Sequence, residues 1–127
     1  MDKACTRYAG AGAAFVRYSE NNEDGATMDE PTLAALQRLV KIARSDTGQA
    51  RRVANFILAW WNADSLGGFD IADLFAVDTK IAADMATVFS WLARQDQAVY
   101  PTDHRAEIEA MMAEWRPEVW AQSKQPA

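Results

Sequence analysis

The chain has 127 residues, of which half are hydrophobic and five are tryptophan, and its formal net charge is -5. This length and composition predict one globular domain with a real hydrophobic core, and they exclude an intrinsically disordered protein. Residues 63–127 carry eleven Asp/Glu against five Lys/Arg, which argues against general nucleic-acid binding because phosphate contacts need a basic surface. The lone Cys5 excludes an intrachain disulfide and a cysteine-rich metal site.

The apolar runs in the sequence are short. None approaches the roughly 18 residues that a membrane span needs. Near the N-terminus, Arg7 interrupts the apolar stretch that a signal peptide would require. The sequence therefore predicts no membrane segment, and a cytoplasmic location is the expectation.

Residues 1–28 permit two readings, a docked helix or an arm. Aromatic residues at helical spacing favour the helix, whereas Gly10 and Gly12 weaken it. Residues 19–27 are polar and turn-rich, as in a loop. A helix should then begin at Pro31, because proline suits the first helical position and Asp29 and Glu30 favour its positive end. Its expected buried stripe is Leu33, Leu36, Val40 and Ala43, with Leu39 at the margin.

The stretch Val53–Asp78 holds the densest apolar run and the only Gly-Gly pair. Apolar residues at helical spacing predict a helix from about Thr47 to Asn62, capped by Asp46 and Gln49. Gly67 and Gly68 predict a turn. Asp70 and Asp78 are the expected N-caps of a short and then a long helix. We expect the tryptophan-bearing helix and the long helix to lie side by side.

The long helix should run from about Thr79 to Arg94, and another should follow Tyr100-Pro101. The expected buried stripes are Ile81, Met85, Val88, Phe89 and Leu92 in the first and Ile108, Met111, Met112 and Trp115 in the second. No segment alternates with the period of a strand. The prediction is an all-α fold, a single compact bundle of five or six helices, with a helical domain at 29–122 and a disordered tail at 123–127.

No catalytic set is visible in the sequence. His104 is the only histidine, in a charged first turn where a solvated position is expected, and Cys5 has no identifiable base beside it. No phosphate-binding, dinucleotide-binding, zinc-protease or serine-hydrolase motif is present. We therefore expect neither an enzyme nor a bound cofactor.

The segment Asn62–Asp73 partly fits a calcium-binding EF-hand loop, with Gly67 at the turn position. However, Leu66 falls where a ligand is needed, and Asp73 replaces the long bidentate glutamate. The alternative is a glycine turn followed by helix caps. The sequence leaves calcium binding at this loop open but predicts no metal site.

Two surfaces are candidates for binding. The first is acidic and aromatic, with Trp60 and Trp61 as anchors and Asp64, Asp70, Asp73 and Asp78 as steering charges. It would suit a protein partner, such as a basic host protein that itself binds nucleic acid. The second is a basic cluster of Arg44, Arg51, Arg52 and Asn55, which would suit a small DNA-binding regulator. An open apolar patch would indicate a partner site or a homodimer.

The segments TGQARRVANFILAWWNA and GGFDIADLFAVD, with a weaker match at WRPE from Trp115 to Glu118, resemble a family of small uncharacterised proteobacterial proteins. Genes of that family often lie among conjugative-element, plasmid or prophage genes. The resemblance covers roughly residues 33–120 and implies a mobile-element accessory protein. Its sharpest implication is an anti-defence, anti-CRISPR-like factor that works by non-enzymatic protein contact.

Overall fold

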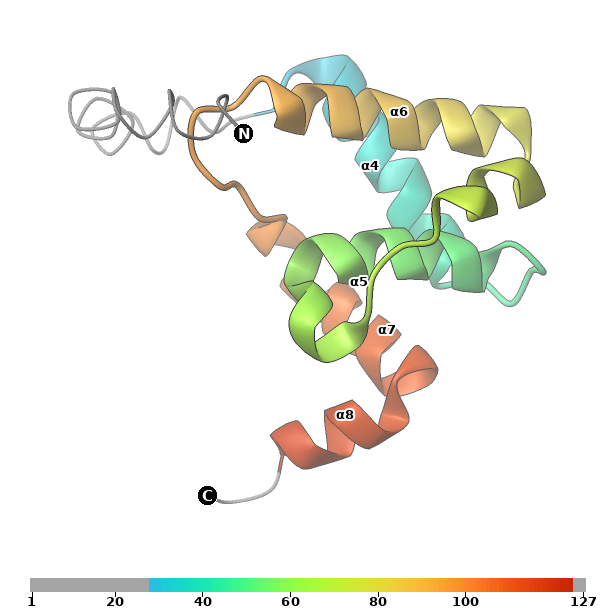
Figure 1. Ribbon diagram of the computed structural model, residues 1–127, viewed down its shortest axis with the longest axis vertical. Helices are drawn as coiled ribbons and strands as arrows, with labels where there is room; N and C mark the ends of the chain where they lie inside the picture. Colours follow the sequence, from blue (N-terminus) through green and yellow to red (C-terminus); the bar gives the residue numbers. More distant parts are fainter. Residues whose placement is uncertain (1–27, 125–127) are drawn as a thin grey trace.

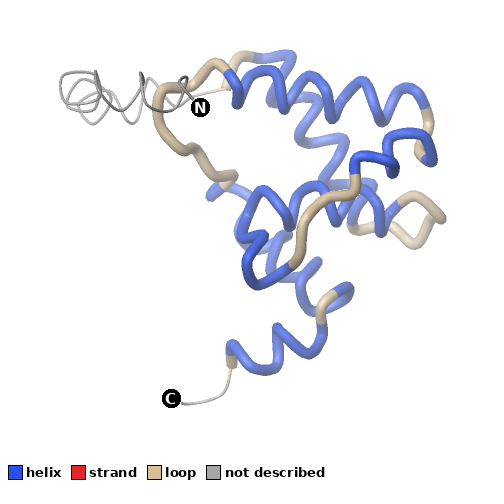
Figure 2. Tube along the Cα trace, viewed as in Figure 1, coloured by secondary structure: helices blue, strands red, loops and turns tan. Residues whose placement is uncertain are grey.

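The computed structural model describes residues 28–124, and its regular structure is helical throughout (Figures 1 and 2). The helices are α4 (Glu30–Ala43), α5 (Ala50–Leu66), the 3-10 helix η1 (Ile71–Ala76), α6 (Thr79–Ala93), the 3-10 helix η2 (Thr102–His104), α7 (Arg105–Trp115) and α8 (Pro117–Ser123). The predicted all-α class is confirmed. The N-terminal helix or arm predicted for residues 1–28 lies outside the described residues, apart from Met28. The predicted tail at 123–127 begins in the last residue of α8, and residues 125–127 also lie outside.

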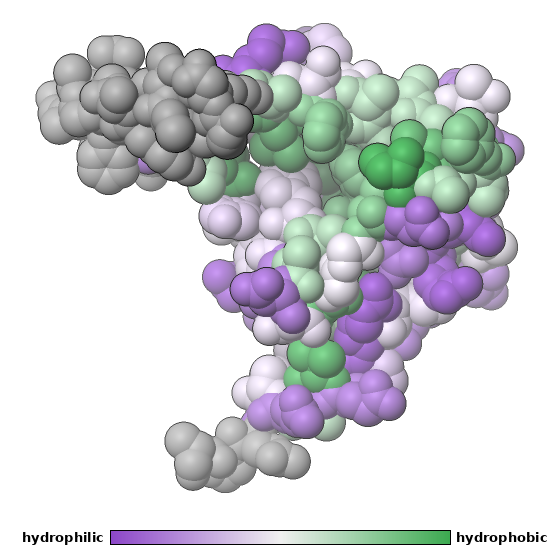
Figure 3. Space-filling model, viewed as in Figure 1, coloured by the Kyte–Doolittle hydropathy of each residue, from purple (hydrophilic) through white to green (hydrophobic). Residues whose placement is uncertain are grey.

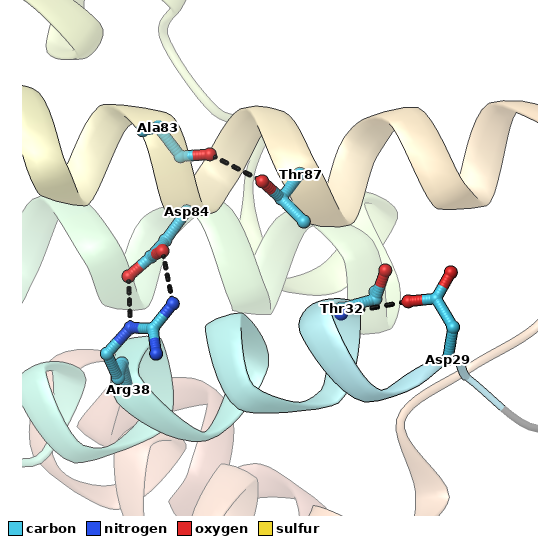
Figure 4. Close-up of polar contacts among 6 residues, drawn as sticks. All are labelled: Asp29, Thr32, Arg38, Ala83, Asp84 and Thr87. Carbon is cyan, nitrogen blue, oxygen red and sulfur yellow. Dashed lines mark hydrogen bonds and ion pairs between the residues drawn. The ribbon is translucent and has the colours of Figure 1, made fainter.

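The start of α4 follows the sequence prediction. Pro31 lies in the first turn, and an Asp29 carboxylate oxygen accepts a hydrogen bond of 2.9 Å from the Thr32 backbone N–H (Figure 4). This bond satisfies one of the donors that every helix N-terminus leaves unpaired. Hydrogen bonds from Thr32 hold the pKa of Asp29 below its ordinary value, with a smaller contribution from the nearby Arg94.

Helix α4 is the central element of the core. It packs against both α5 and α6, while α5 also packs against α7, and α8 packs on α7. In Figure 1, α4 passes behind the space between α6 and α5. Its inner face supplies buried apolar side chains all along its length, namely Ala35, Leu36, Leu39, Val40 and Ala43. Burial of this face against two neighbouring helices is what holds them in one domain.

A bidentate ion pair joins α4 to α6. The Arg38 Nε and a terminal guanidinium nitrogen donate to the two carboxylate oxygens of Asp84 at 2.9 and 2.8 Å (Figure 4). The hydrogen bond to Asp84 raises the pKa of Arg38. Because the Arg38 side chain is exposed, this pair orients the two helices more than it stabilises them.

The predicted pairing of α5 with α6 is wrong. Each packs closely against α4, but in the described chain the two do not form a closely packed pair with each other. The residues between them, 67–78, cross from the end of α5 to the start of α6, and we call this segment the strap. Only Gly67 in the strap has a positive φ, at 94°, which is the conformation that glycine tolerates best.

Two other expectations about α5 need correction. The helix begins at Ala50, and neither Asp46 nor Gln49 caps it through a side chain. The Gln49 side chain instead bonds to Asp78, accepting from its backbone N–H at 2.5 Å and donating to its carboxylate at 3.3 Å. Asn62 does interrupt the helix, with φ -169° and ψ 85°, but another helical turn follows as far as Leu66.

Many predicted core positions are buried, two are exposed, and Leu92, Met112 and Trp115 are among those that are half-buried. Leu36, Val40 and Ala43 are buried in α4, as are Ile81, Met85 and Val88 in α6. Leu33 and Phe89, however, retain 38% and 65% of their exposure. Leu33 lies in the first turn of α4, outside the contact between helices. Phe89 lies on the side of α6 that turns toward α5, where no helix packs.

We expect Leu39→Ala to reduce the free energy of unfolding by about 2–5 kcal/mol, because it opens a cavity at a side chain with 0% exposure. Leu33→Ala makes the same chemical change in the same helix at a half-exposed position, and its loss should be less than half as large. Urea unfolding followed by circular dichroism measures both. Equal losses would contradict this assignment of the core.

The cap at Asp29 should make stability depend on pH. A depressed folded-state pKa means that the cap stabilises the fold above the unfolded-state pKa, and this contribution disappears as the pH falls through the lower folded-state value. Asp29→Ala should therefore lower the melting temperature at neutral pH, and the difference from the native chain should vanish in strong acid. A difference that persisted unchanged in acid would exclude the carboxylate as its cause.

Candidate functional site

An apolar groove lies between α5 and α6, with the strap as its third wall. Its volume is about 600 Å³. The described residues that line it are Phe56, Ala59 and Trp60 from α5, Phe69, Ile71 and Leu74 from the strap, and Ala82, Met85, Ala86, Phe89 and Leu92 from α6. The groove exists because α5 and α6 both pack against α4 and leave the space between their outer faces unfilled.

Large apolar side chains at the groove are open to solvent. The side chains of Phe89 and Ile71 are 65% and 67% exposed, and that of Phe75, which lies in the strap with Ile71, is 89% exposed. Figure 3 shows hydrophobic residues gathered over α6 and η1 on this face, bordered by hydrophilic ones. Scattered single apolar residues are normal on a protein surface, whereas a contiguous apolar patch of this kind is less common.

The walls of the groove are apolar. All eleven described lining residues are apolar, and none of them titrates. The one polar group in its walls, the Trp60 indole N–H, donates to the backbone carbonyl of Val99 at 2.7 Å.

The strap is fixed at several points along its length. At its start, the Phe69 ring meets Phe56 of α5 edge-on, with ring centroids 5.3 Å apart. Farther along, an Asp73 carboxylate oxygen lies 3.3 Å from the Arg52 Nε, an ion pair without hydrogen-bond geometry. The bonds between Asp78 and Gln49 hold its end. The strap is therefore a built wall of the groove.

The predicted acidic and aromatic surface is divided by the structure. Trp60 lines the groove, whereas Trp61 faces away from it, with the Arg105 guanidinium 5.1 Å from its ring centroid. Both tryptophans are half-buried. Asp64 is exposed after the Asn62 kink, and Asp70 caps η1 by accepting from the Ala72 N–H at 2.9 Å, as predicted.

Asp73 and Asp78, the other two predicted carboxylates, hold the strap through Arg52 and Gln49. The strap as a whole still carries three aspartates and no lysine or arginine. Its carboxylates thus have structural tasks and also give one wall of the groove a negative charge.

The predicted basic cluster is divided as well. Arg44 and Arg51 are exposed, and Arg44 borders a shallow polar depression with Lys41, His104 and Glu107. Arg52 is paired with Asp73. The Asn55 side-chain oxygen accepts a bond of 2.7 Å from Arg116, so this amide is part of the fold.

Within residues 28–124, no group of three or more His, Cys, Asp or Glu side chains is placed to hold a metal ion. In the loop that partly fits an EF-hand, the Asn62 side chain bonds to Ser65, and Asp70 and Asp73 have the partners already described. None of the helices in the described chain is both long and apolar enough to cross a membrane.

Sequence reasoning missed the most exposed groove residues, Phe89 and Ile71. A usable signal existed in α6, where Ala82, Ala86 and Phe89 form an apolar stripe beside the buried stripe of Ile81, Met85 and Val88. A helix with an apolar arc this wide needs a second partner besides the core. The sequence pattern could have predicted that second face but not which element would leave it open.

The stretch from α4 to the end of α7, which builds the groove, is also the stretch that comparison with known proteins identifies. Residues 33–116 match the model of a family of unknown function, DUF7673. The chain belongs to this family. No curated protein and no solved structure matches it. This match supports the prediction of an uncharacterised domain. The matched region ends at Arg116.

Arg116 ties the end of α7 to α5. Its Nε donates to the Leu66 carbonyl at 2.7 Å, and its terminal nitrogens donate to Asn55 at 2.7 Å and to the Trp115 carbonyl at 2.9 Å. These bonds satisfy the carbonyl at the end of α5, where the strap begins.

Arg116→Ala should therefore reduce the free energy of unfolding by about 1–3 kcal/mol, because it leaves half-buried acceptors without a donor. Arg116→Lys should restore little, since an ammonium cannot reproduce the planar set of donors. The control Arg51→Ala, at an exposed arginine, should stay within about 0.5 kcal/mol of the native chain. Thermal or urea unfolding compares the three, and an Arg116→Ala variant as stable as the control would contradict this role.

Proposed function

We propose that the chain is a non-enzymatic protein-interaction domain that binds an apolar, positively charged segment of a partner protein in the α5–α6 groove. The observation that carries this proposal is the exposure of Phe89 and Ile71 on a groove whose walls are otherwise formed and fixed. Burying one such side chain contributes about 1.5–3 kcal/mol. Each therefore corresponds to roughly a ten- to hundredfold change in Kd.

The groove suits a protein segment better than a small molecule. A volume near 600 Å³ falls within the usual range of ligand pockets. Such pockets, however, place a few polar groups to orient the ligand, and the polar group of these walls, the Trp60 N–H, already has a partner. An amphipathic helix needs no such groups, because it satisfies its own backbone and presents apolar side chains at helical spacing.

The charge around the groove supports a basic partner. Residues 63–103, which include the strap, α6 and the connection to η2, carry seven aspartates against Lys80 and Arg94. Two of these aspartates, Asp73 and Asp84, are paired with arginines. The remaining negative charge would speed the approach of a positively charged segment and orient it. Of the predicted steering residues, Asp64, Asp70 and Asp78 form no ion pair with a described residue.

The biological setting of this binding rests on resemblance. Similarity to small proteobacterial proteins encoded among mobile-element genes supports a role as an accessory factor. An anti-defence role, in which the groove captures a basic segment of a host nucleic-acid-binding protein, is the specific form we propose. A cytoplasmic location fits such a role.

The test places a photo-cross-linking amino acid at position 89 of the full chain in its native host. We expect a cross-linked partner protein, lost when Ile71→Asp is added to the opposite wall. The same cross-linker at Tyr100, which is 50% exposed but does not line the groove, should capture none. Equal capture from both positions would refute the groove as the site. Salt-sensitive binding of duplex DNA that is lost in Arg44→Glu and Arg51→Glu would instead establish the DNA-binding alternative.

A further inference from the structure

We propose that a second copy of this chain covers the exposed apolar stripe of α6, so that the two α6 helices pack antiparallel about a two-fold axis. The inference concerns the α6 wall of the groove, but it does not require the proposed function to be correct. Three features of the described residues support a second copy as the occupant: the spacing of the stripe, the apolar area around it and the distribution of charge along α6.

Helix α6 carries two apolar stripes side by side, each repeating at intervals of four, three and four residues. The first stripe turns toward α4 and consists of Ile81, Met85, Val88 and Leu92. The second lies one residue later along the chain, on the side of the groove, and consists of Ala82, Ala86, Phe89 and Ala93. Intervals of three and four residues are the spacing at which two helices pack along a shared seam. The first stripe has its partner in α4, whereas Ala86, Phe89 and Ala93 of the second are exposed.

The second stripe is complementary to itself. Three of its members are alanines, and the fourth is the large side chain of Phe89. When two such stripes run antiparallel about a two-fold axis, Phe89 of each copy falls opposite Ala86 of the other, and Ala82 falls opposite Ala93. A large side chain then meets a small one in both halves of the contact, and the alanines let the helices approach closely. A parallel pair in the same register would instead set the two Phe89 rings against each other.

The exposed apolar area is of the size that a dimer needs. Three large apolar side chains, Phe89, Phe75 and Ile71, are mostly exposed on this face. Since an aromatic side chain buries on the order of 150–250 Å², these three offer roughly 300–500 Å² on each copy. A standard interface buries about 800 Å² per partner. The three side chains thus supply about half of it, and the alanine stripe between them adds to that area.

The charges of α6 also favour an antiparallel pair. No charged residue lies between Met85 and Ala93, so two copies can meet there without removing a charge from water. The strap with its aspartates lies beside the N-terminal end of α6 (Figure 1), and Arg94 follows the C-terminal end. Antiparallel packing places the acidic strap of each copy near Arg94 of the other and keeps the two straps apart.

Sedimentation velocity of the full chain tests the association. The native chain should change from monomer to dimer as its concentration rises. Phe89→Ala should raise the dimer Kd at least about a hundredfold, because each dimer loses two buried rings and each ring contributes about tenfold or more. Ala86→Asp should abolish the dimer, because it places a carboxylate in the seam.

The matched control is Ala106→Asp, the same change at an exposed alanine in the first turn of α7. An aspartate is favoured in a first helical turn, and the Kd should stay within about twofold of the native value. A native chain that stays monomeric at every concentration would overturn the proposal. Equal dimerisation of Ala86→Asp and Ala106→Asp would overturn it as well.

Disulfide formation tests the antiparallel arrangement, in chains whose single cysteine is removed by Cys5→Ser. Ala82→Cys in one chain and Ala93→Cys in another should form a disulfide when the two are mixed, because these positions face each other across the seam. Each variant alone should form none, since identical positions lie about 16 Å apart along the antiparallel helices and a disulfide needs Cα atoms within about 7 Å. Disulfides in either variant alone, or none in the mixture, would overturn the antiparallel pairing.

The dimer and the proposed function can fail separately. Phe89 cannot contact a second copy and a partner at the same time, so a partner has to displace the second copy. A chain that is monomeric at every concentration and is still cross-linked to another protein from position 89 would refute the dimer and leave the partner site intact. A dimer that Ala86→Asp abolishes, in a chain that captures no other protein, would support the dimer alone.

Discussion

The packing of α4 against both α5 and α6 is the constraint on which the rest of the structure depends. A single helix with a wide buried face can hold two neighbours only if they approach it from different sides. The outer faces of α5 and α6 then cannot close on each other, and the apolar residues there remain open. The groove is thus a consequence of how the core is assembled.

The aspartates of the strap have two roles, since they fix the strap in place and also give it a negative charge. Asp70 caps η1, Asp73 meets Arg52, and Asp78 is bonded by Gln49. Individually, such exposed contacts contribute little stability. Together they fix the strap as a wall, and they leave that wall negatively charged. The predicted steering role and the observed structural role are therefore compatible for these carboxylates.

Local rules predicted most of the fold, because caps and apolar periodicity act within one or two turns. The Asp29 and Asp70 caps, Pro31 in the first turn of α4 and the buried stripe of α6 up to Val88 were all predictable. The partner of each helix was not, since α5 and α6 are neighbours in sequence but not in packing. Phe89 was assigned to the core for the same reason, as periodicity shows that a face is apolar and not what covers it. Gln49 and Asn55 have partners, Asp78 and Arg116, that are distant in sequence and follow no local pattern.

The central claim, that α4 and the strap hold α5 and α6 apart, is tested most directly by nuclear Overhauser contacts in the full chain. Ala59 and Ala86 face the groove from opposite walls, while Phe56 and Phe69 touch where the strap meets α5. The account predicts contacts between the Phe56 and Phe69 rings and none between the Ala59 and Ala86 methyl groups. A direct contact between those two methyl groups would show that the groove is closed in solution and would contradict the account.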